Sequence, residues 1–240
     1  MAEPKLRILA LGAHADDLEI LCAGTLARWA KAGHYLVMAT ATVCELGSFD
    51  LSREECSRVR HAEAAESAAL IGAEYKMLRF PDGGVNSTDP TQQLKVVELI
   101  RQVRPDVIVT HAPTDYHLDH HHISELVRWA GPHAGIPQIE TGSPAITNNP
   151  AVYFMDTLNG RYFEPGEYVD ISDTLETKRA MMRCFRSQLV YLKKYYNMDP
   201  LEQIEVTARY RGIQAGVRYA EAFQRYGATG FGDLTRRYLP

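Results

Sequence analysis

The chain has 240 residues and a formal net charge of −4, and 45% of its residues are hydrophobic. This composition is typical of a globular protein with a full core, and the slightly acidic balance argues against a nucleic-acid partner. No run of residues approaches the roughly 18 apolar residues of a membrane span. The four cysteines form no CxxC pair, which predicts reduced thiols in a cytoplasmic protein.

Strand-like and helix-like segments alternate through the first half of the chain. Apolar and β-branched runs predict strands at residues 7–11, 34–43, 75–80 and 106–110. Helices are expected between them: at 24–32, from a capping box of Ser52 and Glu55 to Gly72, and from Asp89-Pro90 to a residue before Pro105. Acidic residues follow the first apolar run at once, which indicates a strand and not a signal peptide.

This alternation predicts an α/β fold, with a Rossmann-like, doubly wound and mostly parallel sheet flanked by helices. In such a fold the first and fourth strands lie side by side where the winding reverses, and ligands bind outside the carboxyl ends of the strands. The loops after Leu11 and after Thr110 are therefore expected to face each other across a crevice.

The second half of the chain carries weaker signals. Residues 131–150 contain three glycines and four prolines without an apolar period, which predicts a long loop that is either a functional lid or disordered. Strands are expected at 151–157 and 167–171, and helices at 173–195 and 201–223, within one domain over residues 1–240. Aromatic residues near the end of the chain indicate a surface for homo-oligomer formation; they are Tyr191, Tyr195, Tyr196, Tyr210, Tyr219, Phe223 and Tyr226.

Histidines and carboxylates gather in the two loops that are expected to meet. The first loop reads HADDLE from His14, and the second reads DYHLDHHH from Asp115. Imidazoles and carboxylates in a cleft are the ligands of a divalent transition metal, and zinc fits them best. A catalytic zinc takes three protein ligands and leaves a position for water. Fe²⁺ or Co²⁺ could use the same ligands.

The two loops resemble the paired motifs of the PIG-L/LmbE zinc-dependent N-acetylglucosaminyl deacetylases. Residues 14–19 resemble the HPDDxE signature of that family, and residues 117–120 resemble its HxDH motif. The resemblance extends over most of the chain, with two departures: Ala15 replaces the usual proline, and His121 replaces a frequent arginine. The other similar positions are Glu45 with Gly47, Arg60 with Glu63, Asp82-Gly83-Gly84, Tyr168-Val169-Asp170-Ile171, Lys178 and Ser187-Gln188.

The resemblance implies a role for each site residue. His14, Asp17 and His120 would hold the zinc ion, and Asp16 would be the general base for the attacking water. His117 would stabilise the oxyanion and protonate the leaving amine, while Asp119 would orient an imidazole. The amino-sugar pocket would be lined by Glu45, Arg60 and Asp82. The expected reaction is removal of the acetyl group from a small molecule that contains N-acetylglucosamine.

Two other functions stay open at this point. The same site could belong to an amidase that cleaves a larger acyl or thiol conjugate. A doubly wound protein could also bind a sugar or nucleotide without turning it over, although the first turn lacks the GxGxxG phosphate cradle. Several residues have simpler readings as well: Asp82 as a turn residue, Arg60 as a surface ion pair, and His111, His121 and His122 as supporting residues.

Overall fold

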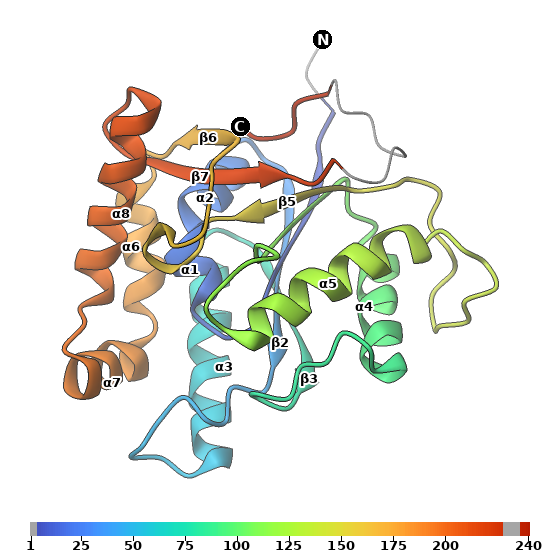
Figure 1. Cartoon of the computed structure of the whole chain (residues 1–240), viewed down its shortest axis with the longest axis horizontal. Coiled ribbons are helices and arrows are strands. Elements are labelled where there is room, and N and C mark those ends of the chain that lie inside the picture. The colour runs from blue at the N-terminus through green and yellow to red at the C-terminus, as the bar shows by residue number, and fades with distance from the viewer. Residues whose placement is uncertain (1–3, 228–235) are drawn as a thin grey trace.

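The computed structural model describes residues 4–227 and 236–240, and they form an α/β fold around a seven-stranded sheet (Figure 1). Its strand order is β3-β2-β1-β4-β5-β7-β6. The first five strands pair in parallel, and β7 runs antiparallel between β5 and β6. The predicted doubly wound, mostly parallel sheet is confirmed. The strands are β1 (Arg7–Gly12), β2 (Tyr35–Thr42), β3 (Glu74–Phe80), β4 (Val107–Thr110), β5 (Ala151–Met155), β6 (Glu167–Asp170) and β7 (Ala220–Arg225).

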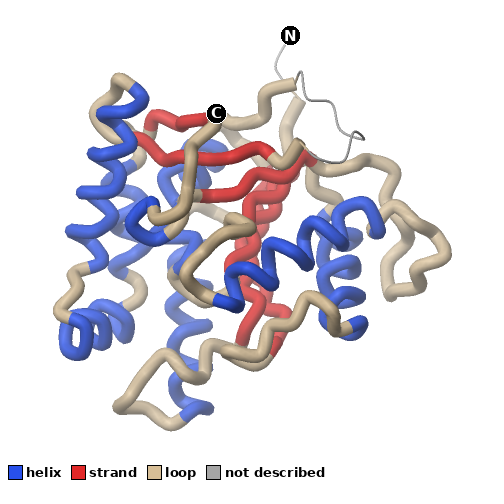
Figure 2. Tube along the Cα trace, viewed as in Figure 1, coloured by secondary structure: helices blue, strands red, loops and turns tan. Residues whose placement is uncertain are grey.

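Helices cover both faces of the sheet, with α4 and α5 on one side and α6 and α8 on the other (Figure 2). None of the helices in the described residues combines the length and apolar composition that crossing a bilayer requires. The helices are α1 (Asp17–Leu21), α2 (Ala23–Lys31), α3 (Arg53–Leu70), α4 (Pro90–Val103), α5 (Leu118–His133), α6 (Leu175–Arg183), α7 (Arg186–Tyr196) and α8 (Pro200–Ala215), with a short 3₁₀ helix at Leu158–Gly160.

Strand β1 shows how the sequence divides the core between the two faces. Ile8 and Ala10 belong to the cluster shared with α2 and α6, whereas Leu9 and Leu11 belong to the cluster shared with α4 and α5. Successive side chains of a strand point to opposite faces. A run that is apolar at every position is therefore buried on both sides, as central parallel strands are.

The helix starts follow their sequence signals. Ser52 and Glu55 form the predicted capping box at the start of α3, because each side chain bonds to the other's backbone N–H. The carboxylate of Asp89 caps α4 ahead of Pro90, a residue that suits the first helical position because it needs no N–H partner there.

Four predictions for the second half were wrong. The helix expected at 201–223 ends at Ala215, where Gly216 takes a φ of 73° and closes it, and the residues after it form β7. The helix expected at 173–195 is two helices, α6 and α7, separated at Cys184 and Phe185. The loop expected at 131–150 begins later, because α5 continues to His133. Phe223, assigned to an oligomer surface, is buried in the core.

A buried ion pair ties β7 to the first half of the chain. The carboxylate of Glu221 accepts hydrogen bonds from the backbone N–H of Gly24 at 2.9 Å and of Thr25 at 2.7 Å, at the start of α2. It also lies 2.5 Å from the ammonium of Lys178 on α6. Both charged residues are buried, so each depends on the other for compensation.

Replacement Glu221→Ala should therefore destabilise the protein by about 3–5 kcal/mol, since it leaves the Lys178 charge buried and unpaired. Urea-induced unfolding measures this loss. The matched control is Glu66→Ala, which removes an exposed pair with Arg186 and should leave the unfolding midpoint unchanged. Equal unfolding midpoints for the two variants would show that the buried pair contributes no more to stability than the exposed pair.

Candidate metal centre and active site

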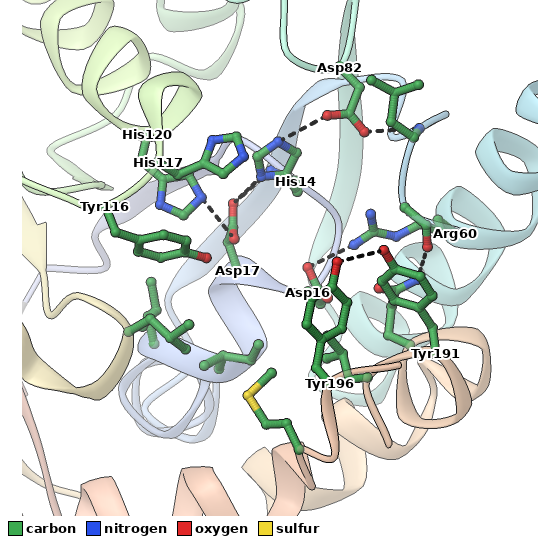
Figure 3. Close-up of a pocket in the computed structure, with 18 of the residues that line it drawn as sticks. His14, Asp16, Asp17, Arg60, Asp82, Tyr116, His117, His120, Tyr191 and Tyr196 are labelled. Atoms are coloured by element: carbon green, nitrogen blue, oxygen red, sulfur yellow. Dashed lines mark hydrogen bonds and ion pairs between the residues drawn. The ribbon is translucent and has the colours of Figure 1, made fainter. Parts of the chain in front are cut away.

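The site lies where the carboxyl ends of β1 and β4 meet. These strands pair in parallel up to Leu11 opposite Thr110, so the loops that follow them come together, as predicted. The first loop carries His14, Asp16 and Asp17, and the start of α5 carries His117 and His120; Figure 3 shows these side chains converging on one cavity.

Asp17 joins the candidate metal ligands. Its carboxylate oxygens lie 3.6 Å from Nδ1 of His14 and 3.4 Å from Nε2 of His120. Two ligand atoms on a tetrahedral zinc ion are separated by roughly 3.3 Å, given bonds of about 2.0–2.1 Å. Each of the two distances therefore fits a pair of ligands on one ion, and the two pairs use different oxygens of Asp17.

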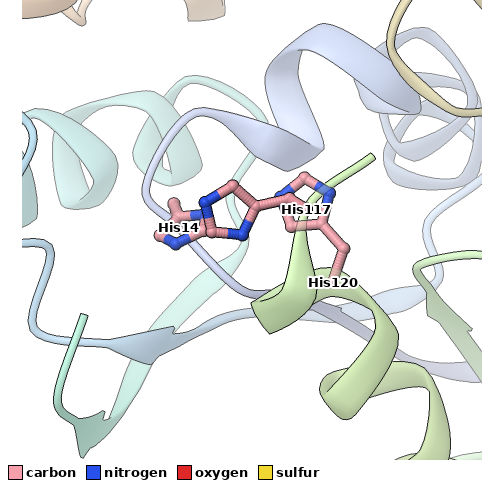
Figure 4. Close-up of side chains that lie close together, drawn as sticks. All are labelled: His14, His117 and His120. Carbon is pink, nitrogen blue, oxygen red and sulfur yellow. The ribbon is translucent and has the colours of Figure 1, made fainter. Parts of the chain in front are cut away.

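The histidines and carboxylates form three compact groups that could each hold a metal ion. One contains His14, His117 and His120, whose rings lie together in Figure 4. A second contains Asp17, His111 and His120, and the third contains His14 with Asp82 and Asp119. The expected set of His14, Asp17 and His120 is divided between these groups. Asp17 lies within 4 Å of each of the two histidines.

Carboxylates on the outer side of the cluster orient its imidazoles. Nε2 of His14 lies 3.2 Å from Asp119 and 3.4 Å from Asp82. Asp119 is itself fixed, because it accepts hydrogen bonds from the backbone N–H of Gly83 at 2.8 Å and of Val85 at 3.2 Å. Carboxylates that bond the second nitrogen of a histidine are a regular feature of metal sites.

The electrostatics of the cluster favour a bound cation. Burial disfavours charge on His120, but Asp17 and Asp115 outweigh this effect and raise the pKa of His120 to about 9. Burial also opposes ionisation of Asp17, and the imidazoles of His120 and His111 nevertheless lower the pKa of Asp17 well below its usual value. The site therefore stabilises positive charge, which a divalent ion supplies in place of protons.

Asp16 is a buried carboxylate with an unusual backbone. Its φ of 120° lies in a region that residues other than glycine rarely adopt, and such strain is typical of functional sites. Burial raises the pKa of Asp16 to about 6, although the guanidinium of Arg60 opposes this shift. Arg60 donates to Oδ1 of Asp16 at 2.9 Å and also to the carbonyl of Ala15. A carboxylate with this pKa can accept a proton near neutral pH.

The residues expected around the sugar occupy different places. Arg60 and Asp82 line the cavity, whereas Glu45 accepts a hydrogen bond from the backbone N–H of Asp82 at 3.2 Å and supports that turn. Gly47 leaves room for the guanidinium, because a Cβ at this position would overlap Nη1 of Arg60.

The other histidines that follow β4, apart from His120, have separate environments. His117 lines the cavity, and its Nδ1 accepts the backbone N–H of Asp119 at 3.2 Å. His111 is fully buried, with Nε2 3.0 Å from Asp17. His121 accepts the backbone N–H of Asp115, and His122 contacts Ser87. His121 and His122 therefore contact the backbone and side chains around the loop, whereas His111 lies in one of the three candidate metal groups, and a supporting role for these residues stays a prediction.

Sequence reasoning missed Cys44, which supports the first loop. Its Sγ accepts the buried backbone N–H of Ala15 at 3.2 Å. Proline, the usual residue at this place in the family signature, has no N–H and needs no such partner. Cys44 adopts a left-handed φ of 56°, and like the three other cysteines it is a free, buried thiol. We infer that Cys44 compensates for the change to Ala15.

The fold and this cluster define an α/β protein with a candidate metal centre at its switch point. The family described as PIG-L, GlcNAc-PI de-N-acetylase, matches residues 9–130, more than half of the chain, and the chain belongs to this family. The resemblance inferred from the two paired motifs is thereby confirmed.

Similar proteins cover nearly the whole chain. A diacetylchitobiose deacetylase from Thermococcus kodakarensis is 28% identical over 230 residues, which are 91% of this chain and 82% of the relative. The structure of the conserved protein TT1542 from Thermus thermophilus is 29% identical, with a TM-score of 0.79 over 95% of this chain and 99% of the other. A 4-carboxy-2-hydroxymuconate hydratase from Pseudomonas putida shares the fold at 21% identity, with a TM-score of 0.80 over 95% of this chain and 98% of the other.

The contact between Cys44 and Ala15 can be tested with a double-mutant cycle. Cys44→Ala should destabilise the protein less in an Ala15→Pro background than in the parent, because the proline has already removed the N–H donor. We expect a coupling of about 1 kcal/mol in urea-induced unfolding. Cys56→Ala is the matched control: this neighbouring buried thiol bonds the carbonyl of Cys44, and its effect should add to that of Ala15→Pro. Additive effects in both cycles would contradict the inferred compensation.

Proposed function

We propose that the protein is a zinc-dependent hydrolase that removes the acetyl group from a small molecule containing N-acetylglucosamine. The observation that carries this proposal is the position of Asp16, a buried carboxylate beside the candidate metal ligands. The description of the family as a de-N-acetylase and the deacetylase from Thermococcus kodakarensis support the same reaction.

In this proposal His14, Asp17 and His120 hold the metal ion. Zinc fits their mixture of nitrogen and oxygen donors and their pairwise spacing, and Fe²⁺ or Co²⁺ are alternatives for the same ligands. A bound divalent ion would polarise the amide carbonyl and lower the pKa of water to about 7. Asp119 and Asp82 keep the ring of His14 in place.

Asp16 is the proposed general base. It accepts a proton from the attacking water, and its pKa of about 6 keeps it mostly ionised at neutral pH while leaving it basic enough for that transfer. Arg60 fixes the carboxylate through the hydrogen bond to Oδ1 and thereby aims it into the cavity. The proton on Asp16 can then pass to the leaving nitrogen, so that the products are acetate and a free amine.

His117 is the proposed donor to the oxyanion. Burial lowers the pKa of His117, so its ring is neutral and carries one proton. Because Nδ1 accepts the backbone N–H of Asp119, this proton is on Nε2, which is left free to donate a hydrogen bond. A fixed donor of this kind stabilises the tetrahedral intermediate more than the substrate.

Removal of the metal should abolish acetate release, and adding back Zn²⁺ should restore it. Replacing a ligand should have the same effect as a chelator, so His120→Ala should lose the metal ion and turnover together. The neighbouring His121→Ala is the matched control, since His121 bonds the backbone N–H of Asp115 and belongs to none of the candidate metal groups found among the described residues. Elemental analysis gives the metal content of each variant. Full activity in metal-free protein would refute the zinc-dependent mechanism.

Asp16→Asn should lower kcat for acetate release by about 10²- to 10⁴-fold, the usual contribution of a general base. Asparagine tolerates positive φ better than most residues, so the fold and the metal content should be retained. The exposed Asp173→Asn serves as the control and should leave kcat unchanged. A panel of amides then separates the two enzyme classes: release of bulkier acids in preference to acetate would favour an amidase.

A further inference from the structure

The cavity continues beyond the candidate metal centre along a second, largely apolar wall. Its volume is about 570 Å³, within the range of sites that hold a drug-sized ligand. One end has the histidines and carboxylates described above. The rest of the lining is mostly apolar or aromatic and comes from α7, the turn after it, the 3₁₀ helix and the loop after β2, which contribute Leu46, Leu158, Tyr191, Leu192, Tyr196 and Met198.

Two tyrosines connect this wall to the reacting end. The hydroxyls of Tyr191 and Tyr196 lie 3.3 Å apart, and both residues line the same cavity as Asp16 and Arg60 (Figure 3). Their ring centroids are 5.6 Å apart with an interplanar angle of 67°. Phe49 packs edge-on against Tyr191 at 5.3 Å and so supports that ring. Fixed aromatic rings of this kind offer a large contact area to another ring.

Charge is confined to the reacting end of the cavity. Among the described residues that line it, Arg60 is the one permanently cationic side chain, and its guanidinium already bonds Asp16 and the carbonyl of Ala15. Lys194 on α7 is paired with Asp50 at 2.9 Å and does not line the cavity. A phosphate or carboxylate on the far part of a substrate would therefore meet apolar side chains and tyrosine hydroxyls but no free cationic side chain among the described residues that line the cavity, so it would lack the strong, charge-assisted hydrogen bonds that stabilise a bound anion.

We propose that the substrate carries, beyond its acetamido sugar, an uncharged ring that packs against Tyr191 and Tyr196. These two tyrosines are then residues that determine specificity, and they select against anionic substituents such as a sugar phosphate. The inference rests on the proposed deacetylase function, because it takes the candidate metal centre as the place where the acetamido group binds.

Three kinds of probe test this proposal on the metal-loaded protein: N-acetylglucosamine, its phenyl glycosides (both anomers), and its 1-phosphate. We expect kcat/KM for acetate release to be about tenfold higher for one phenyl glycoside than for the free sugar, and lowest for the phosphate. Tyr191→Ala and Tyr196→Ala should each reduce the advantage of the phenyl glycoside by about three- to tenfold, the effect of losing one ring contact. The loss should appear in KM, because the contact exists before and during the reaction.

Two variants serve as controls. Tyr191→Phe retains the ring and should retain the preference, which separates packing from hydrogen bonding by the hydroxyl. Tyr210→Ala removes an exposed ring on α8 that does not line this cavity, and its kinetics should match those of the parent. A preference for the phosphate, or equal kcat/KM for all three probes in the parent, would overturn the proposal.

A failure of the uncharged-ring inference can be distinguished from a failure of the proposed deacetylase function. If no probe releases acetate, the deacetylase proposal fails, and calorimetric binding of the same probes decides the inference by itself. Binding of a phenyl glycoside at least about tenfold tighter than the 1-phosphate, and weakened in Tyr196→Ala, would then support the uncharged-ring site. Equal or reversed affinities would refute it.

Discussion

Backbone pairing between β1 and β4, from Ile8 opposite Val107 to Leu11 opposite Thr110, holds together two loops that are distant in the sequence. His14 and Asp119 are 105 positions apart, and their side chains lie within 3.2 Å because these two strands end at the same edge of the sheet. The contacts of His14 and Asp17 with Asp119 and His120 depend on that register. A slip of one residue in β4 would reverse its side chains between the two cores and move α5 away from the first loop.

The site concentrates unfavourable features that the rest of the fold must compensate. Asp16 has a strained backbone, and its carboxylate and the Arg60 guanidinium are both buried. Buried charges of this kind contribute little to stability, and strained positions persist only where surrounding structure enforces them. Here the surrounding structure consists of well-packed strands, the contact of Cys44 with the loop, and the space that Gly47 leaves for Arg60. This pattern indicates that the conformation of the loop serves the position of the Asp16 carboxylate and not the stability of the fold.

Much of the fold could be predicted because its signals are local. Apolar β-branched runs marked the parallel strands, and Ser52 with Glu55 marked the start of α3. The meeting of the two loops followed from the doubly wound order. Strand β7 could not be predicted in the same way, since residues 220–225 become a strand only through pairing with β5 and β6. Propensity is weak evidence where such long-range pairing decides the structure.

The candidate site residues show the same difference between local and long-range signals. His14, Asp16, Asp17, His117 and His120 belong to short motifs, so their convergence could be anticipated from the sequence. Their grouping could not, because it depends on side-chain positions: Asp17 faces both His111 and His120. The roles of Cys44, Tyr191 and Tyr196 have no motif either. Cys44 contacts Ala15, which is distant in the sequence, and the two tyrosines reach the cavity from α7.

The place of β7 also bears on the order in which the molecule can be assembled during synthesis. In the described sheet β6 reaches the other strands through β7, and the carboxylate that caps α2 is supplied by Glu221. A nascent chain that has already formed β1 to β5 therefore leaves β6 unpaired and the start of α2 uncapped until Ala220–Arg225 emerge from the ribosome. Because β7 is synthesised after β6, addition of β6 to the sheet must wait for it.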